Sequence, residues 1–230
     1  MIDLLIINAD DYGMCESVDD GIIHGSKEGL ITSTTVFMNQ PHIAKELERL
    51  KDTSLGVGVH LNVTFGTPLT SGKSFLKDGR FRKRNEYLDR IMINEEELYE
   101  EWKAQIERFI ALTGHKPDHI DSHHNIHLLY SEVYKTIAKE YDLPTRNDQV
   151  RKIHLFHMKD KLCDQALLQE VIHKNTGVLE MMTHPGYHSI TLSKLSSYAC
   201  GRERELRFWC DQKTKDILQN VRLGNFGDLN

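Results

Sequence analysis

Residues 2–13 read IDLLIINADDYG, an apolar run that ends in two adjacent aspartates. The run has the length and composition of a buried β-strand, and polar residues begin where that strand is expected to end. Adjacent carboxylates repel each other, and neither is buried cheaply without a partner. The pair therefore either points into water, as Asp does at turns and helix N-termini, or lies against a positive group.

Strands and helices alternate along the rest of the chain. A connection rich in Gly, Lys and Arg spans 63–94, and connections of that length are often functional. The alternation favours a parallel sheet with right-handed crossovers. We expect an α/β fold, a TIM-like β/α barrel with or without irregularities, in which residues 1–230 form a single domain. Further strands are expected at 32–38, 55–62, 119–124, 144–147, 153–157, 178–184 and 221–226, and helices at 16–29, 42–52, 95–113, 131–141, 160–174 and 201–219.

Composition and charge argue against several classes of partner. Charged residues make up 27% of the chain and hydrophobic residues 39%, which is typical of soluble globular proteins. A net charge of −5 gives no support to a nucleic-acid or anionic-membrane partner. No apolar stretch approaches the roughly 18 residues of a membrane span, and the N-terminus, with Asp3, does not resemble a signal peptide. We expect a cytoplasmic protein without nucleic-acid or membrane partners.

Acidic and histidine side chains gather at the expected carboxyl ends of four strands. In a β/α barrel these ends form the rim that holds the active site. Histidine is the commonest metal ligand and also the usual acid or base near neutral pH. The residues at these strand ends are Asp10, Asp11, His60, Asp121, His123, His124 and His184.

Asp11, His60 and His123 can supply ligands for one catalytic divalent metal ion. Two imidazoles and one carboxylate are a common set that leaves a coordination position for water or substrate. Successive strand residues face opposite ways, so Asp10 can join Asp11 only if the strand end turns. Asp10 would then lie beside the metal as a base, and the cation would offset the repulsion between the two carboxylates. The crowding of histidines leaves open which of them binds the metal.

Three other residues have weaker assignments from the sequence. Asp121 could orient a metal-binding imidazole. His127 shares a face with His123 if the chain turns helical after residue 124. Arg146 could contact a sugar or a phosphate on it, although a surface arginine is the more ordinary interpretation. By donor type, Zn²⁺, Co²⁺ or Mn²⁺ would suit the site as well as Mg²⁺.

Five segments of the chain together resemble the YdjC-like carbohydrate deacetylases. They are NADDYG (8–13), TSTT (32–35), GVHLN (58–62), KPDHIDSHHNIH (116–127) and EMMTHPG (180–186), in that order. The family is similar to chitooligosaccharide deacetylases and distantly related to polysaccharide deacetylases. The resemblance implies a β/α barrel, one Mg²⁺ ion, and hydrolysis of the N-acetyl group of an acetylated amino sugar. On this chain it implies Asp10 as the catalytic base, Asp11, His60 and His123 as metal ligands, and His184 as the general acid.

This chain departs from the family pattern at two positions, and three functions stay open. Tyr12 replaces the more usual phenylalanine, and Asn125 stands where many relatives have another histidine. The expected enzyme releases acetate from a small saccharide, phosphorylated or not, chosen by the connection 63–94. A metal-dependent phosphoesterase would instead favour two adjacent metals. A non-catalytic sugar- or metal-binding protein would need neither Asp10 nor His184. A homodimer is one possible oligomeric state.

Overall fold

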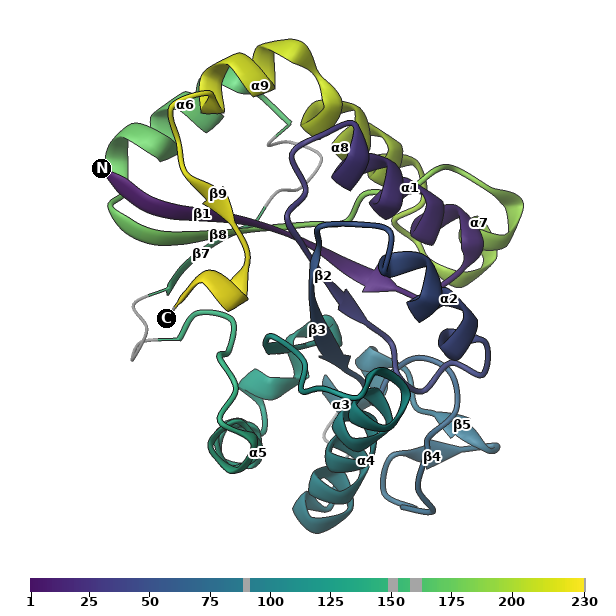
Figure 1. Ribbon diagram of the computed structural model, residues 1–230. Helices are drawn as coiled ribbons and strands as arrows, with labels where there is room; N and C mark the ends of the chain where they lie inside the picture. Colours follow the sequence, from purple (N-terminus) through teal and green to yellow (C-terminus); the bar gives the residue numbers. More distant parts are fainter. Residues whose placement is uncertain (89–91, 149–152, 158–162, 230) are drawn as a thin grey trace.

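A parallel sheet with β1 (Ile2–Tyr12) near its middle forms the centre of the structure (Figure 1). The computed structural model describes residues 1–88, 92–148, 153–157 and 163–229. Its strands pair in the order β6-β3-β2-β1-β8-β7, and β9 pairs with β1 at Leu5 and Ile6. Because these pairings are parallel, the carboxyl ends of the strands lie at one edge of the sheet. The other strands are β2 (Ser33–Val36), β3 (Gly56–Leu61), β6 (Ile120–Ser122), β7 (Ile153–His157), β8 (Gly177–Thr183) and β9 (Leu223–Gly224).

Helices follow most strands and pack around the sheet. In Figure 1, α6 lies beside α9 at the top, α1 beside α8, and α4 beside α5 at the bottom. The longer helices are α1 (Glu16–Lys27), α2 (Ile43–Leu50), α4 (Glu95–Thr113), α5 (Ser131–Tyr141), α6 (Gln165–Lys174), α8 (Cys200–Cys210) and α9 (Gln212–Leu218). The shorter elements are α3 (Arg84–Leu88), α7 (Ile190–Leu195), the 3₁₀ helices His123–Leu128 and Phe226–Leu229, and a hairpin of β4 (Leu76–Lys77) and β5 (Arg80–Phe81).

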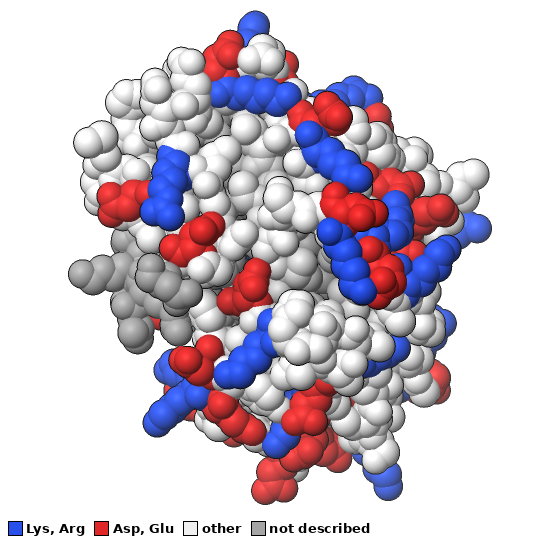
Figure 2. All heavy atoms as spheres, viewed as in Figure 1, with Lys and Arg blue, Asp and Glu red and all other residues white. Residues whose placement is uncertain are grey.

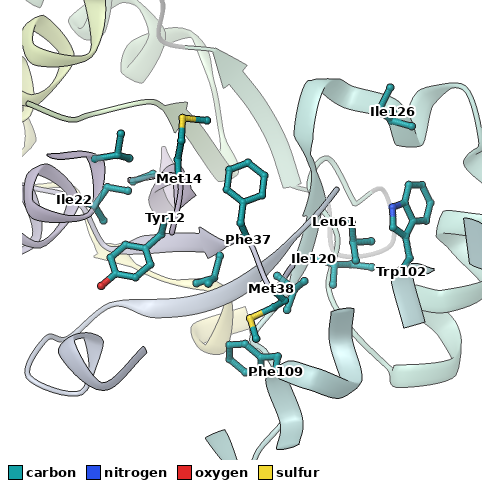
Figure 3. Close-up of a cluster of buried hydrophobic side chains, with 14 of the residues drawn as sticks. Tyr12, Met14, Ile22, Phe37, Met38, Leu61, Trp102, Phe109, Ile120 and Ile126 are labelled. Atoms are coloured by element: carbon teal, nitrogen blue, oxygen red, sulfur yellow. The ribbon is translucent and has the colours of Figure 1, made fainter. Parts of the chain in front are cut away.

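Both faces of β1 are buried, which explains the apolar run Leu4–Ile7 at its centre. Leu4 and Ile6 belong to a small apolar cluster, whereas Leu5 and Ile7 belong to a much larger one. Since successive side chains of a strand point to opposite sides, the two clusters lie on opposite faces of the sheet. Figure 3 shows members of the larger cluster, among them Tyr12, Ile22, Phe37, Trp102 and Phe109.

The sequence predicted the boundaries of α4 because its end signals are strong. Asn94 precedes the helix, and its side chain accepts a hydrogen bond from the backbone N–H of Glu97 at 3.0 Å. Gly114 ends the helix in the left-handed conformation, with φ of 80°. By contrast, the single helix expected over 201–219 is two helices, because Asp211 is extended and caps α9 through the N–H of Lys213.

Other expectations need smaller corrections. The strand expected at 144–147 amounts to one isolated bridge between Ile120 and Thr145. The connection 63–94 contains α3 and the β4–β5 hairpin rather than irregular chain alone. Residues 160–162 of the helix expected over 160–174 lie outside the described residues, and α6 begins after its capping residue Asp164.

The parallel sheet and its surrounding helices confirm the expected α/β fold. The strand order has β6 and β7 at its two ends, so closure of the sheet into a barrel stays a prediction. None of the described helices is both long and apolar enough to cross a membrane. Lys and Arg side chains are interspersed with Asp and Glu over the face seen in Figure 2.

Candidate metal and catalytic site

A backbone turn at the end of β1 brings both adjacent aspartates to the same edge of the sheet. Asp11 has φ of 76°, in the left-handed region, and the pairing with β2 shifts register between Ala9 and Tyr12. Asp is among the few residue types that enter this region readily. The turn interrupts the strand alternation, and the Asp10 and Asp11 side chains are both buried at the carboxyl end of the sheet.

Asp11, His60 and His123 converge as the sequence predicted. Asp11 Oδ1 lies 3.2 Å from His60 Nε2 and 3.0 Å from His123 Nδ1, and these two nitrogens are 3.2 Å apart. Among the described residues, Asp11 Oδ1 is buried and accepts no hydrogen bond of good geometry. A buried carboxylate oxygen facing two imidazole nitrogens fits a divalent cation, with a donor set suited to zinc, cobalt or manganese as well as magnesium.

Asp121 sets the orientation and protonation of the His60 ring. Its Oδ1 lies 2.5 Å from His60 Nδ1, and Thr35 Oγ1 donates to its Oδ2 at 3.0 Å. With Nδ1 donating to Asp121, Nε2 is the nitrogen that faces Asp11 and His123. Burial lowers the pKa of His60, but the Asp121 and Asp11 carboxylates outweigh it and raise the pKa to about 10. A metal ion would therefore have to displace a proton from this ring.

Opposite charges keep the buried carboxylates ionised. Burial alone would raise the pKa of Asp11, yet the guanidinium of Arg202 holds it well below its usual range. The same balance applies to Asp121, whose pKa is lowered by His60 and Arg146 against the effect of burial. The pKa of His123, in contrast, is lowered by its burial, which favours the neutral ring that binds metals.

Arg146 is buried in the site and holds Asp10 in place. Its Nη1 donates to Asp10 Oδ2 at 2.9 Å and its Nη2 to Asp10 Oδ1 at 2.6 Å, a two-pronged ion pair. The same side chain contacts Glu180 through Nε at 2.9 Å and Asp121 through Nη2 at 2.8 Å. The interpretation of Arg146 as a surface residue is therefore wrong. Its three guanidinium nitrogens all contact carboxylates. Arg146 also lines the pocket, so its contact with a sugar stays a prediction.

His184 lies next to Asp10, at the end of the neighbouring strand. Its Nε2 is 3.9 Å from Asp10 Oδ2, and its side chain is 26% exposed, more than that of Asp10 at 3%. The two residues reach the same point because β1 and β8 are adjacent in the sheet. A buried carboxylate and a solvent-accessible imidazole thus stand side by side next to the Asp11–His60–His123 group.

The remaining histidines of the cluster have different surroundings. His124 and Asn125 both have left-handed backbones, with φ of 58° and 56°, and this tight turn directs His123 toward Asp11. The His127 ring bonds Ser122 Oγ at 2.6 Å and packs against a tyrosine, so its predicted role beside the metal ligands gains no support.

A pocket of about 1100 Å³ opens above these residues. Its floor includes Asp10, Asp11, His60, His123 and His184. One wall comes from the connection 63–94, with Phe65, Lys83 and Arg84. The other comes from the last residue of α7, Leu195, and the residues that follow it up to Tyr198. A large cleft with polar groups converging on its floor is the usual form of a small-molecule site.

Sequence reasoning missed two buried charged residues of α8. Arg202 contacts Asp11, and Glu205 contacts the end of β8. A signal was present, because Arg202, Glu205 and Trp209 follow helical spacing and would form one face of the predicted helix. Charged residues on the same face as a tryptophan indicate burial with partners.

Comparison with known proteins agrees with this arrangement. The model of the family described as YdjC-like protein matches residues 4–220. Carbohydrate deacetylase 2 of Listeria innocua is 32% identical over 98% of this chain and 98% of its own length. A carbohydrate deacetylase of Oceanobacillus iheyensis is 35% identical over 89% of this chain and 94% of its own.

Two solved structures resemble the fold to different degrees. A putative cellobiose-phosphate cleavage protein from Enterococcus faecalis V583 superimposes with a TM-score of 0.90 at 29% identity, covering 100% of this chain and 99% of its own. A mutant of the peptidoglycan deacetylase PdaC from Bacillus subtilis shares the fold, with a TM-score of 0.55 at 11% identity. The match covers 98% of this chain and 89% of that protein. The family match and these relatives show that the chain belongs to the YdjC-like family.

Proposed function

We propose that this protein is a metal-dependent carbohydrate deacetylase that removes an N-acetyl group from an amino sugar and releases acetate. The observation that carries the proposal is the placement of Asp10 and His184, 3.9 Å apart, beside the Asp11–His60–His123 group on the floor of one pocket. The names of the curated relatives support the same reaction. Residues 1–230 would act as one deacetylase domain.

The pocket suits a small acetylated saccharide. At about 1100 Å³ it exceeds the space that a single sugar ring needs, so a chitooligosaccharide or a similar short chain would fit. Phe65, Leu195 and Tyr198 offer apolar surface to sugar rings, and Lys83 and Arg84 lie at the same pocket. Acetate release from a saccharide and from its 6-phosphate would show whether the preferred substrate is phosphorylated.

Asp11, His60 and His123 would hold one divalent ion, Mg²⁺ by family resemblance and Zn²⁺, Co²⁺ or Mn²⁺ by donor type. When bound, such an ion acts as a Lewis acid toward the acetyl group and the attacking water. Asp121 would keep His60 in the tautomer that leaves Nε2 available to the ion.

Asp10 and His184 would carry the proton transfers. Asp10 takes a proton from the water whose oxygen attacks the acetyl carbon. The bond from carbon to nitrogen then breaks, and His184 donates a proton to the departing amine nitrogen. The products are acetate and a free amino sugar. Arg146 fixes the Asp10 carboxylate through two hydrogen bonds, so the base is oriented before substrate arrives.

A two-metal phosphoesterase is less well supported by the same residues. Asp10, His60 and Asp121 form a second group of possible ligands. However, Arg146 Nη2 lies 2.6 Å from Asp10 and 2.8 Å from Asp121. A guanidinium already compensates these carboxylates, and its positive charge opposes a second cation there. We therefore expect one metal ion per chain.

The proposal is tested by acetate release from N-acetylglucosamine, diacetylchitobiose and their 6-phosphates. Each reaction is run with Mg²⁺, Mn²⁺, Co²⁺ or Zn²⁺ and with a chelator, and metal content is counted per chain. We expect acetate from at least one substrate, abolished by the chelator, with one metal per chain. Absence of acetate from all four by the metal-loaded protein, together with hydrolysis of phosphoesters, would overturn the proposal.

A further inference from the structure

One face of α8 lies against the ends of β1 and β8 and carries two buried charges. Arg202, Glu205 and Trp209 are spaced three and four residues apart and are 2%, 0% and 0% exposed. Glu203 and Arg207 on the same helix pair with each other, and the Arg207 side chain is 76% exposed. Buried charges destabilise a fold unless they are paired. The burial of Arg202 and Glu205 therefore requires partners for both side chains.

Arg202 occupies one of the two oxygens of Asp11. Its Nη2 donates to Asp11 Oδ2, and its Nε donates to the carbonyl of Tyr198 at 3.1 Å. The other oxygen, Asp11 Oδ1, faces His60 and His123. With Oδ2 engaged, Asp11 has one oxygen left for a metal ion. The guanidinium also places a positive charge one carboxylate away from that ion.

Glu205 holds the residues around His184. Its carboxylate accepts hydrogen bonds from Thr183 Oγ1, from the backbone N–H of His184 at 2.6 Å and from Tyr198 Oη at 2.6 Å. Trp209 Nε1 donates to Thr183 Oγ1 at 2.9 Å and so extends the network along the helix. The Tyr198 ring lies edge-on to the His184 ring, with centroids 6.1 Å apart. Glu205 therefore fixes both the backbone of His184 and the aromatic wall beside its imidazole.

We propose that Arg202 and Glu205 are positioning residues with separate tasks, an inference that rests on the proposed deacetylase function. Arg202 restricts Asp11 to a single donor oxygen and limits how tightly the site binds a divalent ion. Glu205 orients His184 for protonation of the leaving amine and leaves metal binding unaffected. One helix can perform both tasks because β1 and β8 are neighbours in the sheet. Asp11 lies near the end of β1, and His184 directly follows β8.

Metal binding tests the role of Arg202 without any need for turnover. The Kd for Co²⁺ is measured by calorimetry for wild type, R202M and the exposed control R207M. Removing the guanidinium frees Asp11 Oδ2 and removes the repulsion of the ion, so we expect R202M to bind Co²⁺ about tenfold or more tightly than wild type. R207M should match wild type. Unchanged or weaker binding by a folded R202M would overturn this part of the inference.

Steady-state kinetics test the role of Glu205, with E203Q as the matched control. A misplacement of about 1 Å in a reacting group can cost about a hundredfold in rate. We expect E205Q to lower kcat at least tenfold while KM stays within twofold and the Kd for Co²⁺ is unchanged. If E205Q does not fold, Y198F removes one of the three hydrogen bonds and should lower kcat by a smaller factor. A kcat within twofold of that of E203Q would overturn the role of Glu205.

An incorrect function and an incorrect role for α8 would give different experimental results. If the metal-loaded wild type releases no acetate from any saccharide, the proposed function is wrong, and the Co²⁺ measurements still decide the role of Arg202. If wild type is active and R202M and E205Q behave like their controls, the function stands and the inference about α8 is wrong.

Discussion

Replacing Asp10 by asparagine separates the roles of the two adjacent carboxylates. Asp10 contacts Arg146 and Asn8, whereas Asp11 contacts His60, His123 and Arg202. We therefore expect D10N to keep its metal ion and to lose turnover. A general base contributes about 10²- to 10⁴-fold to the rate, which corresponds to about 3–5 kcal/mol in the activation barrier.

The same substitution has a predictable cost in stability. Arg146 donates two hydrogen bonds to Asp10, at 2.6 and 2.9 Å, and an asparagine can accept only one of them. Losing a hydrogen bond to a charged group costs about 1.5–3 kcal/mol. For a domain of this size each kcal/mol lost from the free energy of unfolding lowers Tm by about 2–4 °C, so we expect the Tm of D10N to be about 3–12 °C below that of wild type. Activity must be compared below the Tm of the variant.

Three measurements on D10N test whether Asp10 serves turnover and Asp11 serves metal binding. They are acetate release, metal content per chain by mass spectrometry, and Tm. D20N is a suitable control, because Asp20 also pairs with an arginine but lies on the surface, away from the pocket. The control should keep both its metal and its rate. If D10N loses its metal, or retains a rate within tenfold of wild type, the division of roles between Asp10 and Asp11 is refuted.

Three further predictions concern stability. Burial raises the pKa of Asp19 to about 7, although the N–H of Gly13 lowers it in part. Between about pH 4 and 7 the carboxyl group is therefore protonated in the folded protein and ionised in the unfolded chain. Stability should fall by up to about 1.4 kcal/mol per pH unit across that range and not change further above it, and urea unfolding of D19N should lack this slope. A Cβ at Gly21 would lie 2.5 Å from Gly186 Cα, so G21A should lose about 1–3 kcal/mol in denaturant unfolding, and an unchanged midpoint would contradict the packing. Arg146→Met leaves three buried carboxylates without their cation, so it should lower the free energy of unfolding by at least about 3–5 kcal/mol in the same assay. A loss close to zero, as expected for a surface arginine, would contradict the buried pairing.

The part of the site that lies at strand ends could be predicted from the sequence. Asp11, His60 and His184 each follow a run whose composition marks a buried strand, and parallel strands bring their carboxyl ends together. The side chain of His123 could be placed less well. It depends on two consecutive left-handed residues, His124 and Asn125, which no periodic pattern reveals.

Partners that are distant in sequence could not be predicted in the same way. Arg146 and Asp10 are 136 residues apart, and Arg202 and Asp11 are 191 apart, so their pairing depends on the packing of the whole fold. The division of 201–219 into two helices depends on the single cap at Asp211. Local propensity favoured one long helix over 201–219, so the extended conformation of Asp211 between α8 and α9 could not be predicted.

The left-handed backbone of Asp11 narrows what can replace it. A residue at this position must present an oxygen to His60 and His123 and must also adopt φ of 76°. Glycine would suit the backbone but has no oxygen to offer, and glutamate would keep the charge but rarely adopts this conformation. Asparagine is the one substitute that meets both demands, with a neutral oxygen in place of a charged one. Few mutational routes therefore lead away from aspartate at position 11 without loss of either the turn or the ligand.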